Sequence, residues 1–120
     1  MQTFVKIISR DQLIKITAQA DKDIRNIYEY IAYDLQSPKN ASNQLERIEK
    51  CIMSLDHLPK RYRFYDREPW KTRGLRIVPI DNYCVFYFVD DDNLTVSIIR
   101  VMYSGRDIIA QLSQQNSSLR

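Results

Sequence analysis

The last third of the chain carries cationic and aromatic side chains whose types suit recognition of a phosphate group or an acidic surface. The cations are Arg76, Arg100 and Arg106, and Tyr103 lies between the last two. An arginine stays protonated and presents a fork of donors to phosphate or carboxylate, so it stabilises negative charge but is a poor base. A tyrosine can stack on a nucleobase or donate a proton. These four residues and Arg73 are therefore the candidate target-binding residues, and the same four are the catalytic candidates if the protein cuts RNA.

A plainer interpretation of these arginines is an ordinary charged surface. In that case they would pair with nearby carboxylates, for which Asp81, Asp90 and Asp107 are the expected partners. Glu68 and His57 could act as acid or base. Each of these two stands alone in the sequence, and a lone titratable residue is more often structural. Both interpretations of the arginines stay open at this point.

The segment from Lys60 to Arg73 mixes six cations with four aromatic side chains. Such mixing is typical of surfaces that bind single-stranded nucleic acid. A tyrosine-rich connection that covers the edge of a sheet would have the same composition, so the segment does not decide between the two. It shows no clean period, and we expect at most a short edge strand from Tyr62 to Tyr65.

The sequence predicts no metal and no other cofactor. The two cysteines, Cys51 and Cys84, are far apart and neither lies near the single histidine, His57, whereas a zinc site needs about four such ligands. Both cysteines are interpreted as buried thiols in a reducing compartment. Signal-peptide and membrane-spanning patterns are missing from the sequence, so we expect a cytoplasmic protein without a membrane partner.

Length and composition indicate one folded domain over residues 1–120. Apolar residues make up 44% of the 120 residues, which is enough for a core, and the net charge of +3 is mildly basic. A surplus this small fits an anionic partner but is also common in soluble proteins. Residues 1–12 are a possible extension, and residues 115–120 are polar enough to form a frayed tail.

Two helices are predicted first. From Ala18 to Leu35, apolar residues recur at steps of three and four, while the charged residues around them, Asp23 included, are expected in solvent. Ser37-Pro38 opens a second such helix, which Pro59 ends. The connection is very short, so the two helices should form an antiparallel hairpin.

Three strands should follow, at residues 75–80, 83–90 and 94–101, because these segments are rich in Val, Ile, Phe and Tyr. Asp81-Asn82 suits a two-residue hairpin turn. Along the middle strand, Cys84 and Phe86 should share one face and Tyr87 the other. A capping box from Ser104 to Asp107 would open a last helix.

Two early segments, Thr3 to Ser9 and Leu13 to Thr17, both have strand composition, and one of them should be an edge strand of the same sheet. The predicted fold is therefore α+β. An N-terminal helical hairpin packs on a twisted, mainly antiparallel four-stranded sheet, and a short C-terminal helix follows.

Three segments are specific in combination, by their order and spacing. They are A-x-x-D-I-x-x-I-x-x-Y-I from Ala20 to Ile31; S-L-x-x-L-P from Ser54, leading through Glu68-Pro69 to Arg76; and Tyr83–Asp90 followed by Ile99–Tyr103 and Arg106-Asp107. Together they resemble the RelE/ParE superfamily of bacterial toxins from type II toxin–antitoxin pairs. The resemblance covers Leu13 to Leu112. It implies a growth-inhibiting toxin of an addiction, or plasmid-stabilisation, module that is neutralised in a hetero-oligomer with a cognate antitoxin protein.

The superfamily contains two mechanisms on one fold. RelE-like members are ribosome-dependent endoribonucleases that cut messenger RNA, whereas ParE-like members bind and poison DNA gyrase. Many of the ribonucleases carry an arginine directly after the tyrosine that opens the middle strand, where this chain has Cys84. The ending RVMYSGRD also resembles the gyrase-directed branch. The resemblance thus favours a ParE-like gyrase poison, with a RelE-like ribonuclease and an inactive binding module of the same fold as alternatives, and it leaves open whether the protein is an enzyme.

Overall fold

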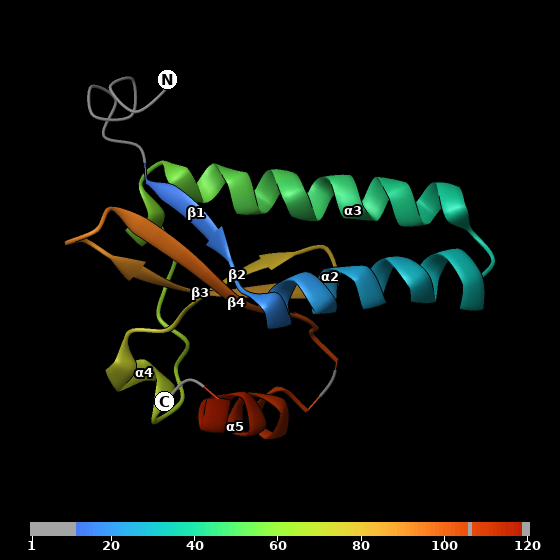
Figure 1. Cartoon of the computed structure of the whole chain (residues 1–120). Helices are drawn as coiled ribbons and strands as arrows, with labels where there is room; N and C mark the ends of the chain where they lie inside the picture. The colour runs from blue at the N-terminus through green and yellow to red at the C-terminus, as the bar shows by residue number, and fades with distance from the viewer. Residues whose placement is uncertain (1–11, 106, 119–120) are drawn as a thin grey trace.

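The computed structural model describes residues 12–105 and 107–118 and has three layers (Figure 1). A four-stranded sheet forms the middle layer. Helices α2 (Ala18–Glu29) and α3 (Pro38–Met53) cover one face, and α4 (Trp70–Arg73) and α5 (Ile108–Ser118) lie on the other. The predicted helical hairpin, sheet and C-terminal helix are confirmed.

The sheet has the strand order β1-β4-β3-β2. Its strands are β1 (Leu13–Ile16), β2 (Arg76–Ile80), β3 (Tyr83–Asp90) and β4 (Thr95–Tyr103). β1 runs parallel to β4, while the other two pairs are antiparallel. The sheet is therefore mainly antiparallel, as predicted. Of the two early segments, Leu13 to Thr17 supplies the edge strand, and Thr3 to Ser9 lies outside the described residues.

The helical hairpin departs from the prediction at its tip. Thr17 caps α2 by accepting a hydrogen bond from the N–H of Ala20 at 3.1 Å, which fixes where the helix begins. The helix does not continue regularly to Leu35. Its last part is a π-helical turn, η1 (Tyr30–Asp34), in which the N–H of Leu35 bonds to the carbonyl of Tyr30. This widened turn ends the helix just before the connection to α3.

The connection from α3 to β2 contains two short 3-10 turns, η2 (Ser54–Asp56) and η3 (Pro59–Arg61), and then α4. The sequence did not predict α4. The edge strand expected from Tyr62 to Tyr65 is only a single bridge, between Phe64 and Arg76. The rest of this segment runs alongside β2 as irregular chain.

Two hydrophobic cores lie on the two faces of the sheet. The core beneath α2 and α3 contains Ala20, Ile24, Ile48, Ile52, Leu55, Val78, Val85, Tyr87, Val96, Ile98 and Val101. The core beneath α4 and α5 contains Trp70, Leu75, Ile77, Cys84, Phe86, Ile99, Met102 and Leu112. The alternation predicted along β3 is confirmed, because Cys84 and Phe86 lie in one core and Tyr87 in the other. Burial on both faces explains why the strands have so few polar positions.

The capping box predicted from Ser104 to Asp107 is wrong. Helix α5 begins at Ile108, and it is the carboxylate of Asp107 that caps it, accepting from the N–H of Ala110 at 3.2 Å. The hydroxyl of Ser104 instead donates to the carbonyl of Asn82 at 2.6 Å, and so ties the end of β4 to the β2–β3 turn.

Candidate functional site

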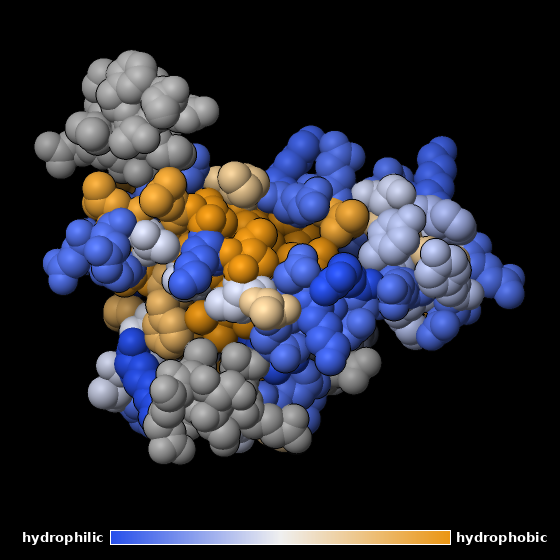
Figure 2. Space-filling model, in the orientation of Figure 1, coloured by the Kyte–Doolittle hydropathy of each residue, from blue (hydrophilic) through white to orange (hydrophobic). Residues whose placement is uncertain are grey.

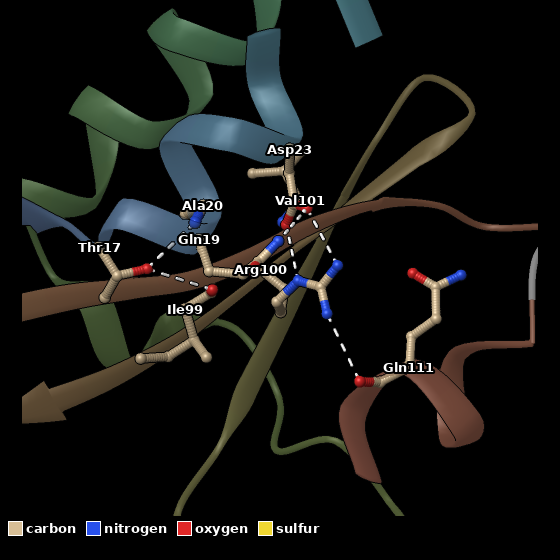
Figure 3. A network of polar contacts seen from close by, with 8 residues as sticks. All are labelled: Thr17, Gln19, Ala20, Asp23, Ile99, Arg100, Val101 and Gln111. Carbon is tan, nitrogen blue, oxygen red and sulfur yellow. Dashed lines mark hydrogen bonds and ion pairs between the residues drawn. The ribbon is translucent and has the colours of Figure 1, made fainter. Parts of the chain in front are cut away.

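Arg100, one of the predicted target-binding residues, lies in a buried polar network (Figure 3). Its Nε donates to Oδ2 of Asp23 at 2.7 Å and its Nη2 to Oδ1 at 3.0 Å, while Nη1 reaches the carbonyl of Gln111 at 3.4 Å. The side chains of Arg100 and Asp23 are only 11% and 7% exposed. The guanidinium therefore joins α2, β4 and α5, and its charge is neutralised inside the protein.

Asp23 is the centre of that network. Besides Arg100, it accepts hydrogen bonds from the side-chain amide of Gln19 at 3.0 Å and from the backbone N–H of Val101 at 3.0 Å. A carboxylate with so many donors has its lone pairs satisfied, which is the condition under which a buried charge is tolerated. The prediction that Asp23 is exposed to solvent is wrong. The sequence did hold a signal for the burial of Asp23, because this residue directly precedes Ile24 at the border of the apolar stripe of α2.

A β-bulge in β4 brings Arg100 to this position. Phe86 of β3 pairs with Arg100 while Tyr87 pairs with Ile98, so Ile99 is an extra residue. The bulge leaves backbone groups that the ladder does not pair, and α2 satisfies them. The hydroxyl of Thr17 donates to the carbonyl of Ile99 at 3.3 Å, and Asp23 accepts from the N–H of Val101. Bulges commonly re-aim a side chain in this way.

Arg76 also has partners within the chain. Its Nη1 donates to the carbonyl of Tyr62 at 2.7 Å and to that of Lys60 at 3.3 Å, and the guanidinium lies 4.1 Å from the centre of the Phe64 ring. Neither arginine pairs with the carboxylates expected from the sequence. Arg100 pairs with Asp23 instead, and Arg76 bonds to backbone carbonyls. Arg76 therefore holds the start of the segment from Lys60 to Arg73 against β2. Since β3 lies between β2 and β4, Arg76 and Arg100 are on opposite sides of β3.

The remaining predicted residues are dispersed. Arg73 is exposed at the end of α4, and Arg106 lies outside the described residues. Glu68 accepts a hydrogen bond from the N–H of Thr72 at 3.1 Å, and its bonds to Thr72 lower the pKa of its carboxyl group. Glu68 is therefore ionised at neutral pH and poorly suited to act as an acid. His57 is exposed beside η2, where its carbonyl accepts from Arg61.

Tyr103 is also exposed, with 49% of its surface accessible to solvent. Its ring meets that of Tyr83 edge to face, with the centres 5.9 Å apart. Gly105 makes this arrangement possible, because a Cβ added there would lie 2.5 Å from Cε2 of Tyr103. The aromatic surface at the end of β4 thus depends on a glycine two residues further along the chain.

An open groove of about 1030 Å³ brings Arg100 and Tyr103 onto one surface. Its walls come from α2, η1, α3 and the ends of β3 and β4. Most of its other lining residues were not predicted as site residues, and they include Tyr30, Tyr83, Asn40, Asn43, Gln44, Arg47 and Asn82. Neither Arg76 nor Arg73 lines it. Three tyrosines and many amide side chains give the groove aromatic faces and hydrogen-bonding groups.

The rim of the groove is organised around the β2–β3 turn. Asp81, which has a positive φ of 55°, accepts hydrogen bonds from Arg47 Nε at 2.7 Å and Gln44 Nε2 at 2.9 Å. These bonds hold the pKa of the Asp81 carboxyl below its ordinary value. On the adjoining wall, burial raises the pKa of Tyr83, with contributions from Tyr103 and Tyr30. Tyr83 therefore stays a neutral phenol that donates or accepts a hydrogen bond.

Cys84 lies in the core beneath α5 and beside Phe86, away from the groove. Burial raises the pKa of its thiol, so it is neither a cation nor a reactive thiolate at neutral pH. Within residues 12–105 and 107–118, no group of three or more potential ligands is placed to hold a metal ion. No helix in that same part is long and apolar enough to cross a membrane.

Comparison with known proteins gives a consistent result. The family model described as the ParE toxin of type II toxin–antitoxin system, parDE, matches residues 14–108. No curated protein sequence matches the chain.

Three solved structures share the fold. The chromosomal ParDE toxin–antitoxin system of P. aeruginosa has a TM-score of 0.65 at 19% identity, covering 79% of this chain and 98% of that one. The RelBE2 toxin–antitoxin complex of Mycobacterium tuberculosis has a TM-score of 0.58 at 21% identity, with coverage of 78% and 91%. A mutant of the E. coli toxin RelE in the free state has a TM-score of 0.57 at 16% identity, with coverage of 89% and 92%. At these identities the likeness establishes the fold alone. The family match spans most of the chain, and the protein therefore belongs to the ParE toxin family of type II toxin–antitoxin systems.

Proposed function

We propose that this toxin inhibits growth by binding DNA gyrase through the tyrosine-lined groove, rather than by cutting RNA. The observation that carries the proposal is the position of Cys84. Where many ribonucleases of the superfamily place an arginine, this chain has a buried thiol beside Phe86. An arginine in that place would have to be desolvated at a large cost, so this buried position requires an uncharged side chain.

The internal partners of the other two candidates support a binding role as well. Arg100 is neutralised by Asp23, and Arg76 is held by two backbone carbonyls and the Phe64 ring. A catalyst of RNA cleavage needs cations whose charge is available to the phosphate. In the described part of the chain, these two guanidinium groups stabilise the fold instead.

The groove has the composition of a protein-binding surface. Tyr30 and Tyr103 are large and exposed, and Arg47 stands at the rim. Tyrosine and arginine are enriched among the residues that dominate binding energy in protein interfaces. We therefore infer that Tyr103 is a main contact with the target.

A ribosome-dependent ribonuclease remains the second candidate, because one surface favours it. Arg63 and Phe64 are exposed beside β2, and Arg67 and Lys71 are exposed further along the same segment. This cationic and aromatic strip has the chemistry of a single-strand nucleic-acid surface. If it binds messenger RNA, it does so away from the groove.

A cognate antitoxin is the second partner in the proposal. The chain has a net charge of +3, and helices cover both sheet faces. We infer that a net-negative antitoxin segment folds along the helical hairpin and the groove, and buries well over about 1,000 Å² in a hetero-oligomer. A basic antitoxin, or one that leaves these surfaces untouched, would contradict this part of the proposal.

Expression in growing cells tests the proposal with a matched pair of variants. Tyr103→Ala removes the groove contact, and Arg67→Ala removes a cation of the strip. We expect Tyr103→Ala to abolish growth inhibition and Arg67→Ala to retain it, with full-length messenger RNA in primer-extension maps. Loss of toxicity in Arg67→Ala alone, together with codon-positioned cleavage, would favour the ribonuclease. No growth defect from the wild-type protein would contradict both mechanisms.

A further inference from the structure

The positive charge of the chain is concentrated in one short segment. Residues 60–73 contain six cations and two carboxylates, Asp66 and Glu68, so their net charge is +4. The whole chain has a net charge of +3, which leaves −1 for the other 106 residues together. A polyanion is therefore attracted to this segment and not to the chain as a whole.

The arginines of the strip differ from those elsewhere in having no carboxylate partner. The arginines of α2, α3 and β4 are all ion-paired: Arg25 with Asp21, Arg47 with Asp81 and Arg100 with Asp23. Within residues 12–105 and 107–118, no carboxylate pairs with Arg63 or Arg67. Lys71 pairs with Asp66 at 3.2 Å, but these side chains are 52% and 79% exposed. Such an exposed pair contributes little, so a phosphate can replace the carboxylate.

Backbone hydrogen bonds hold the three cations of the strip in place. The N–H of Ile77 in β2 donates to the carbonyl of Arg63 at 3.1 Å. The N–H of Lys71 donates to the carbonyl of Arg67 at 2.8 Å, so these two residues stand one helical turn apart on the same side. All three side chains are exposed. The cations are therefore presented by an ordered backbone, which reduces the conformational freedom that is lost on binding.

The aromatic rings of residues 60–73 are already engaged within the protein. A guanidinium lies over one face of each of two rings: Arg61 is 4.7 Å from the centre of the Tyr62 ring, and Arg76 is 4.1 Å from that of Phe64. These cation–π contacts attach the rings to their own chain. They also occupy the faces on which a nucleobase would stack.

The other two rings of the segment belong to the core. Tyr65 meets Phe86 edge to face, with the ring centres 5.3 Å apart, and Trp70 is only 3% exposed. Surfaces for single-stranded nucleic acid combine cations with aromatic faces on which bases stack. The composition of the segment suits a single strand, but the positions of its rings do not. Its cations suit a duplex, which presents phosphates while its bases stay paired.

The strip also lies apart from the groove. Arg63, Arg67 and Lys71 are not among the residues that line the groove. Helix α4, which carries Lys71, lies on the sheet face opposite to α2 and α3, and Figure 2 shows hydrophilic residues where Figure 1 places this helix. A partner on the strip therefore leaves the groove and the helical hairpin accessible.

We propose that the strip binds the phosphate backbone of duplex DNA through Arg63, Arg67 and Lys71. Cations that contact phosphates position a protein on DNA but carry no sequence information, so the binding is independent of sequence. Each contact releases a counterion, which makes the affinity depend strongly on salt. The inference goes beyond the proposed function and does not rest on it, because the groove takes no part in this contact.

Fluorescence anisotropy of the full chain with a labelled DNA duplex of about 20 base pairs tests this inference, at salt concentrations from about 50 to about 200 mM. The strip variant combines Arg63→Gln, Arg67→Gln and Lys71→Gln. Each phosphate contact contributes about −0.9 to the slope of log affinity against log salt, so this variant should make the slope less negative by about 2.7. Its affinity at about 100 mM salt should fall at least about tenfold.

The control variant combines Arg25→Gln, Lys39→Gln and Lys50→Gln. It removes three exposed cations of α2 and α3, and both triple variants lower the net charge from +3 to 0. We expect the control variant to keep the wild-type slope. Circular dichroism verifies that both variants fold, as expected for exposed positions.

Absence of duplex binding by the wild-type chain at about 50 mM salt would overturn the proposal. Equal weakening by both triple variants would overturn it as well, because only the net charge would then matter. Tighter binding of a single-stranded RNA of the same length, lost in the strip variant, would also contradict it and would favour the ribonuclease. Duplex binding that the strip variant alone weakens supports it. Gyrase is absent from this assay, so the result is independent of the proposed mechanism.

Discussion

Removing the side chain of Arg100 should destabilise the whole domain, although a surface arginine would be replaceable at little cost. Arg100→Met removes two charge-assisted hydrogen bonds, at 2.7 and 3.0 Å, from a carboxylate that is only 7% exposed. Leaving one member of a buried ion pair without its partner costs about 3–5 kcal/mol. Asp23 keeps its bonds to Gln19 and Val101, so we expect the lower end, about 3 kcal/mol.

This loss is large for a domain of 120 residues, whose total stability is of the order of 5–15 kcal/mol. Urea denaturation followed by circular dichroism measures it directly, and the melting temperature should fall by about 12 °C. Arg47→Met is the matched control, because the Arg47 and Asp81 side chains are 51% and 36% exposed. Breaking that pair should cost less than about 1 kcal/mol.

A double-mutant cycle measures the interaction between Arg100 and Asp23. Combining Arg100→Met with Asp23→Asn should give a coupling free energy of about 1–3 kcal/mol, as expected for side chains in one network. If Arg100→Met unfolds at the same urea concentration as the wild type but loses toxicity, the reasoning is refuted. Arg100 would then act on the target and not on the fold.

Three further predictions concern the cores and the groove. Cys84→Arg should lower the free energy of unfolding by more than about 3 kcal/mol, measured by urea denaturation, because it buries an unpaired charge. Cys84→Ser should still fold. Gly105→Ala should displace the ring of Tyr103, from which its Cβ would be 2.5 Å, and weaken target binding in a pull-down assay without changing the melting temperature by more than about 4 °C. Burial raises the pKa of Tyr87, whose hydroxyl donates to the carbonyl of Pro59, from 10.0 to about 12. The folded value lies above the unfolded one, so this stabilisation is complete below pH 10 and is lost as the pH rises toward 12. Tyrosinate absorbance should show one late-titrating group that is missing in Tyr87→Phe.

The sequence predicted the elements that its periodicity encodes. The helical hairpin followed from apolar residues at steps of three and four, and the alternation along β3 placed Cys84 in the core. These features depend on local pattern, which a single sequence displays. Helix α4 was missed because it spans only Trp70–Arg73 and is too short to show a period.

The candidate site was harder to predict, because its geometry depends on contacts between distant residues. Arg100 is joined to Asp23 across 77 residues of chain, and the bulge that turns it toward α2 has no marker in the sequence. Arg76 is held by carbonyl groups, which any residue carries. Residue types identified candidates, whereas only the fold distinguished a buried ion pair from an exposed cation.

The most direct test of the proposed mechanism is the supercoiling activity of purified gyrase in the presence of the purified toxin. We predict inhibition of supercoiling by the wild-type protein, no inhibition by Tyr103→Ala, and relief when the cognate antitoxin is added. The same protein, added to translating ribosomes, should leave messenger RNA intact. Normal supercoiling together with codon-positioned cleavage of messenger RNA would contradict the account and assign the toxin to the ribonuclease mechanism.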